Sequence, residues 1–197
     1  MTRRCFVGLL PATFATALTV GAIDVGQIGA AQEAERRFMH SVEEYMTLRR
    51  QIEQQLPPFT MTVDVQEIQR ATKTQAAAIR RTRAGARVGD VFNAGVTELF
   101  RVRIRDAFAG RGHDAVELIH QMNEDGARWH PAVVNGRFSW KTAAATPPYV
   151  LAVLPTLPGE LQYRFVGPDL VLVDIVANFI IDILPDALAV EPSDGAR

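Results

Sequence analysis

The sequence predicts an α+β fold with about four helices, two β-hairpins and a short C-terminal helix in a single domain. In the first half of the chain, apolar residues recur at intervals of three and four, which is typical of amphipathic helices. After Asp125-Gly126, short alternating apolar runs separated by turn residues replace that pattern. Helices and strands in separate blocks of the sequence indicate an α+β arrangement.

The first 31 residues have the composition of an export signal. Two arginines precede an apolar run over residues 5–23, and small residues follow at 29–31. We therefore expect cleavage before Gln32 and a mature domain of residues 32–197. Because the run approaches the length of a membrane span, an uncleaved anchor is the alternative, and it would be the chain's one contact with a membrane.

The same segment bears on the route of export and on the chemistry of the mature chain. Arg3-Arg4-Cys5-Phe6 resembles a twin-arginine signal, and a general secretory signal is equally compatible. Cys5 is the one cysteine, so the mature domain would contain no disulfide and no thiol. A formal net charge of -1 argues against nucleic acid as a partner.

Four helices are expected before Asp125, and each has boundary signals. The first carries a stripe of large apolar residues and ends at Pro57-Pro58. Capping-box spacings precede the second and the fourth, while Gly110 follows the third. The expected ranges are Gln32–Leu56, Val65 to about Arg83, about Asn93–Ala109 and Asp114 to about Asn123.

Two hairpins and a last helix are expected after Asp125. The first hairpin would turn at Asn135-Gly136, and the second would join alternating residues from Leu161 to a β-branched run ending at Val173. Asp174 would then cap a short, buried helix that stops before Pro185. We expect this region to pack on the first helix, with five side chains in one cluster: Phe38, Tyr45, Phe165, Leu172 and Phe179.

The C-terminal run resembles a group of exported, uncharacterised bacterial proteins. The likeness rests on Asn135-Gly136-Arg137 and on the pattern LPxLPxELxYRFVGxDLxLxD from Leu154 to Asp174, followed by Ala177-Asn178. It implies a location in the bacterial envelope and a domain that covers most of the mature chain. It implies no catalytic residue and no cofactor.

The expected fourth helix carries the best candidate for a metal site. His113, Glu117, His120 and Glu124 fall on one narrow stripe, and imidazole with carboxylate can bind zinc or iron. The same stripe lies opposite the apolar face of this helix, where solvated residues belong in any case. We therefore expect no resident cofactor and keep the metal site as the alternative.

Two further groups of polar residues are candidates for a binding or a structural role. Arg80, Arg81, Arg83, Arg101 and Arg105 lie in a basic middle section that could hold a polyanion, or could simply be solvated. Asp174, Asn178 and Asp182 lie in an apolar segment, where each buried carboxylate needs a partner such as Arg164 or a central arginine. We interpret this second group as structural.

The sequence thus predicts an exported envelope protein that binds a partner rather than catalysing a reaction. The partner would be an envelope protein or a polyanion. The alternative is a metal-dependent or hydrolytic envelope enzyme that uses the stripe from His113 to Glu124. No nucleophile elbow and no phosphate-binding glycine loop supports that alternative.

Overall fold

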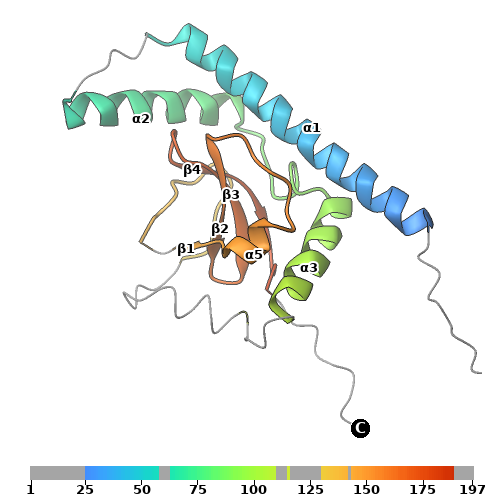
Figure 1. Cartoon of the computed structure of the whole chain (residues 1–197). Coiled ribbons are helices and arrows are strands. Elements are labelled where there is room, and N and C mark those ends of the chain that lie inside the picture. Colours follow the sequence, from blue (N-terminus) through green and yellow to red (C-terminus); the bar gives the residue numbers. More distant parts are fainter. Residues whose placement is uncertain (1–24, 58–62, 110–114, 116–129, 142, 189–197) are drawn as a thin grey trace, which may run out of the picture.

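The first helix, α1 (Val25–Gln55), runs along one side of a small antiparallel sheet (Figure 1). The computed structural model describes residues 25–57, 63–109, 115, 130–141 and 143–188. Within them, four helices accompany one sheet of four strands, so the predicted α+β class is confirmed.

The first three helices overlap their predicted ranges, although α1 begins at Val25 and not at the predicted Gln32. After α1 come α2 (Val65–Thr82) and α3 (Ala94–Ala109), and both pack against α1. Asp64 caps α2, because its side chain accepts a hydrogen bond from the backbone N–H of Gln66 at 2.8 Å. The fourth predicted helix lies outside the described residues except for Ala115.

The sheet has the strand order β1-β2-β3-β4, and all neighbouring strands are antiparallel. β2 and β3 are joined by Gly167-Pro168, and Gly167 has a positive φ of 57°. A glycine suits this position because it has no Cβ to clash in the left-handed region. The strands and the short helix before β2 are β1 (Ala144–Ala145), α5 (Pro148–Leu151), β2 (Leu161–Val166), β3 (Asp169–Asp174) and β4 (Phe179–Leu184).

Both faces of the sheet are buried. On one face, the apolar stripes of α1 and α3 meet the sheet in a single cluster, which we call the main cluster. It contains all five side chains predicted to lie together. Phe38 of α1 lies at the centre of this cluster, with its ring 5.1 Å from that of Phe100 and 6.4 Å from that of Tyr163. On the other face, Phe138 forms a smaller cluster with residues that include Val171 and Ile180. Ala132, Val134 and Ala143 pack against this cluster.

The predicted C-terminal helix is wrong, because residues 179–184 form strand β4. Every residue of β4 is buried, so its sequence lacks the alternation that identifies a strand with one solvated face. A register shift opposite Leu172 and Val173 also breaks the period of two. Asp174 does bind the next backbone N–H groups as a cap would, but a four-residue turn follows it.

The hairpin predicted at Asn135-Gly136 forms its turn but not a pair of strands among the described residues. Gly136 N–H donates to Val133 O at 2.8 Å, and Asn135 has a φ of 61°. The backbone then pairs with the free side of β4: Asn135 N–H donates to Ile180 O, and Ile180 N–H donates to Gly136 O. Beyond the turn, the backbone thus bonds to the edge of β4 instead of forming a two-stranded hairpin among the described residues.

None of the helices in the described part of the chain is long and apolar enough to span a membrane.

Candidate functional site

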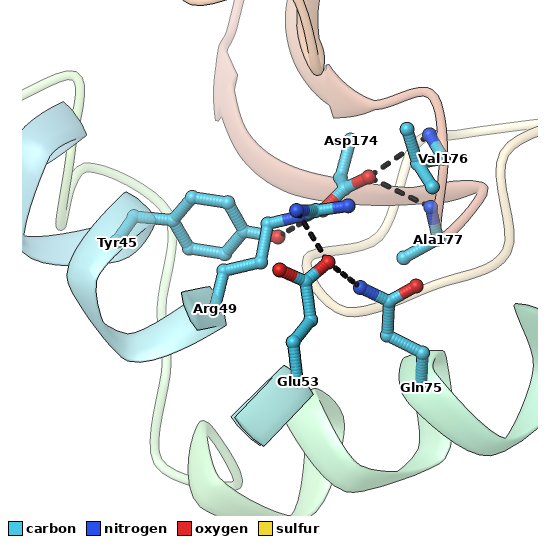
Figure 2. Close-up of polar contacts among 7 residues, drawn as sticks. All are labelled: Tyr45, Arg49, Glu53, Gln75, Asp174, Val176 and Ala177. Atoms are coloured by element: carbon cyan, nitrogen blue, oxygen red, sulfur yellow. Dashed lines mark hydrogen bonds and ion pairs between the residues drawn. The ribbon is translucent and has the colours of Figure 1, made fainter. Parts of the chain in front are cut away.

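Asp174 at the end of β3 is the centre of a buried polar network that ties the sheet to α1 (Figure 2). Oδ2 accepts hydrogen bonds from the Tyr45 hydroxyl at 2.6 Å and from Arg49 Nε at 3.0 Å. Oδ1 accepts from the backbone N–H groups of Val176 and Ala177, at 3.0 and 2.7 Å. Its cationic partner is therefore Arg49, in place of the Arg164 or central arginine that we expected.

The network continues from Arg49 to α2. Arg49 Nη1 lies 2.6 Å from Glu53 Oε1, and the same oxygen accepts from Gln75 Nε2 at 2.6 Å. Burial, together with the neighbouring Asp174, raises the pKa of Tyr45, so its hydroxyl remains a neutral donor. Because its contacts join α1 to α2 and to the sheet, this network holds elements together, and none of its residues lines either of the two cavities described below.

Asp182 of β4 holds the loop that precedes α3. Its carboxylate accepts from the backbone N–H groups of Gly89, Val91 and Phe92 at 2.9, 2.7 and 2.7 Å. Asn178 has a φ of 56°, and its side-chain oxygen accepts from Trp140 Nε1 at 3.0 Å. These contacts fit the structural role that we predicted for Asp174, Asn178 and Asp182.

The five arginines considered for a polyanion come from α2, α3 and the residue after α2. Arg83 Nη1 donates to Asn135 Oδ1 and Nη2 donates to Ile181 O, both at 3.0 Å. Arg101 Nη2 donates to Pro185 O at 2.7 Å, and the Arg80 guanidinium lies 5.7 Å from the Phe179 ring centroid.

Three of these arginines are thus bonded to or stacked on the fold, while Arg81 and Arg105 are exposed. Figure 1 shows α2 and α3, the helices that carry Arg81 and Arg105, well apart. A polyanion site built from all five remains a prediction.

The metal stripe of His113, Glu117, His120 and Glu124 lies outside the described residues. Within the described ranges, no group of three or more His, Cys, Asp or Glu side chains is placed to hold a metal ion.

A cavity of about 430 Å³ opens at the edge of β2, and we call it the β2-edge groove. It is lined by residues 145–146, 151, 155–157 and 161–164. One wall is thus the strand β2, and the opposite wall is α5 with the proline-bracketed connector after it.

The groove exists because β1 is only two residues long. β1 pairs with Phe165 and Arg164 of β2, and the chain then reaches Thr146-Pro147-Pro148. Prolines have no N–H to donate to a strand ladder, so β1 cannot continue beside the first half of β2. Among the described residues, 161–163 have no strand partner on this side. The Thr146 hydroxyl donates to Tyr163 O at 2.9 Å and closes one end of the opening.

Arg164 is the one charged side chain that lines the groove. Its guanidinium lies 5.0 Å from the centroid of the Trp140 ring, and Nη2 donates to Gln162 Oε1 at 2.7 Å. Nε is buried without a hydrogen-bond partner in the described part of the chain, and burial lowers the pKa of this arginine. No described carboxylate forms an ion pair with it.

Two large apolar side chains are exposed at this surface. Trp140 is 49% exposed beside Arg164, and Leu151 is 45% exposed in the wall of the groove. Trp and Arg are enriched among the residues that dominate binding energy at protein interfaces.

Comparison with known proteins finds no matching family model, no matching curated protein and no matching solved structure.

A second cavity lies between α1 and the start of α3, with a volume of about 730 Å³. Arg36, Arg37 and His40 line it from α1, and Asn93 lines it at the start of α3. Both arginines form ion pairs with the same carboxylate, Glu33 of their own helix, so one of the two positive charges is balanced there. This cavity contains none of the residues singled out from the sequence.

The sequence did not indicate the β2-edge groove. The alternation of apolar residues with Gln162 and Arg164 predicts a half-buried strand but does not show which strand lies beside it. The missed signal is the combination of a proline pair that cuts an edge strand short and an arginine on the strand it leaves open.

Proposed function

We propose that this chain is an exported bacterial envelope protein that acts by binding a partner through the β2-edge groove, rather than by catalysis. The observation that carries the proposal is the chemistry of the lining. The lining residues comprise apolar side chains, threonines, one glutamine, one tyrosine and one arginine. These groups can recognise a ligand, but none is a carboxylate or imidazole of the kind that most often transfers protons.

Tyr163 supports the same conclusion. Its ring lies in the main cluster, and its hydroxyl donates to Pro155 O at 3.2 Å. Burial raises its pKa, so the phenol remains neutral across the physiological range. It therefore fixes the connector to β2 and shapes the groove.

The burial of α1 is compatible with export and with cleavage before Gln32. The predicted cleavage site before Gln32 lies within this helix, and residues 26–30 are all exposed. The first buried residue of the helix is Ala34, followed by Phe38. Removing residues 1–31 would therefore leave every described core contact of α1 intact.

Size-exclusion chromatography of extracts from the native envelope tests the binding function. Leu151→Arg places a charge in the groove wall at an exposed position, and Val88→Arg, at a position 53% exposed, is the matched control. We expect the wild type and Val88→Arg to elute in one assembly larger than a single chain, and Leu151→Arg to elute as a single chain. If Leu151→Arg keeps the assembly, the groove is not the binding surface. A mass equal to two copies would make the partner a second chain of the same protein.

A further inference from the structure

The β2-edge groove has three properties that together restrict what it can bind: a partly open strand edge, a wall facing that edge, and a single cation. The strand edge comprises residues 161–163, which span about 10 Å at the rise of a β-strand. Leu161 N–H already donates to Pro158 O at 3.0 Å, and Tyr163 O accepts from the Thr146 hydroxyl at 2.9 Å, so an added strand would bond to Leu161 O and Tyr163 N–H. Such an edge binds a further strand through backbone hydrogen bonds, without regard to most side chains.

The wall excludes a folded sheet edge. α5 and the connector at 155–157 line the groove opposite β2. A strand that is already part of another sheet carries its neighbours with it and would meet this wall. A single extended segment carries no neighbouring strands, so the wall does not exclude it.

Arg164 specifies the charge of that segment. Its guanidinium is held in place by the Trp140 ring at 5.0 Å and by Gln162 at 2.7 Å, and no described carboxylate balances it. A guanidinium that is already oriented by stacking binds a carboxylate through two parallel hydrogen bonds. Because the stacked face is occupied by Trp140, a carboxylate would approach the edge of the guanidinium from the groove.

Resting on the function proposed above, we infer that the partner is an extended polypeptide segment with an acidic side chain, added as a strand beside residues 161–163 with its carboxylate on Arg164. The neighbouring apolar wall at Leu151 takes an apolar side chain of the same segment. Successive side chains of a strand point to opposite sides, so the acidic side chain would face one side of the segment and the apolar side chain the other.

The inference is tested with a displayed library of random octapeptides selected on the purified mature protein. We expect the selected peptides to share an acidic residue within an otherwise β-branched or apolar sequence. Arg164→Gln should weaken their binding at least about tenfold, and Arg164→Lys less, because lysine keeps the charge but loses the paired hydrogen bonds. Arg70→Gln removes an exposed arginine on α2 and should leave binding unchanged.

A second readout leaves the protein unaltered. Methylating alternate backbone nitrogens of a selected peptide removes N–H donors, so one of the two methylation patterns should abolish binding and the other should be tolerated. Equal binding to Arg164→Gln, or tolerance of both patterns, would overturn the inference. Failure to select any peptide would also overturn it, while an envelope assembly that depends on Leu151 would leave the proposed function standing.

Discussion

At the scale of single residues, Asp174 decides how the sheet is joined to α1. Its two oxygens are shared between Tyr45 and Arg49 on one side and two backbone N–H groups on the other. A buried carboxylate without such partners would be unstable, and the buried Arg49 needs a counter-charge for the same reason. The sequence showed that Asp174 needed partners, but its partners lie more than 120 residues away and could not be identified by spacing.

Replacing Asp174 with alanine is expected to destabilise the domain by about 3–5 kcal/mol, because it leaves the Arg49 cation incompletely paired in the interior. Chemical denaturation measures the difference. Asp106→Asn, at an exposed position of α3, is the control and should leave the midpoint unchanged. Equal effects of the two substitutions would show that the network contributes nothing.

Tyr45→Phe is expected to cost about 1.5–3 kcal/mol near neutral pH, because the hydrogen bond it removes has a charged acceptor. Burial and Asp174 raise the pKa of Tyr45 in the folded state, so the folded protein keeps a proton that the unfolded chain loses above about pH 10. The stability advantage of the wild type is therefore complete below that pH and should shrink as the pH rises beyond it. Denaturation of both proteins between pH 7 and about 11 checks the trend; a constant difference would contradict it.

At the scale of elements, the helices could be predicted from the sequence and the last strand could not. α1, α2 and α3 each carry one apolar face, which produces a clear period of three and four. β4 is buried on both faces, so its run of Phe179, Ile180 and Ile181 has no period and is equally compatible with a buried helix. The Asp174 turn added to the error, because a side chain that accepts from the second and third following N–H groups also begins helices.

The loop before α3 provides a test at this scale. Asp182 accepts three of its backbone N–H groups, so Asp182→Ala leaves those donors without an acceptor in the interior. We expect amide hydrogen exchange at Gly89, Val91 and Phe92 to accelerate more than exchange in β2. Unchanged protection of these three amides in the variant would show that another group holds the loop.

At the scale of the whole molecule, the main cluster joins α1, α3 and the sheet, and we expect it to dominate stability. Phe165 is fully buried within it, so Phe165→Ala should cost about 3–5 kcal/mol in chemical denaturation. Arg105→Ala, at an exposed position, should cost far less. A larger effect of Arg105→Ala would place the stabilising contacts outside this cluster.

Export is also a property of the whole chain. We expect mass spectrometry of the exported protein to find Gln32 as its first residue. The 32–197 chain should unfold at the same denaturant concentration as the full-length protein, because residues 26–30 are exposed. An intact Met1 on the exported protein, or a lower midpoint for the shorter chain, would contradict this account.

The binding role of the β2-edge groove is tested most directly by photo-crosslinking in the native envelope. A photoreactive amino acid at Leu151 reports on this groove, and one at His40, which is exposed in the other cavity, reports on the surface between α1 and α3. We expect a discrete adduct from Leu151 that Arg164→Gln removes, and none from His40. An adduct from His40 with none from Leu151 would contradict it.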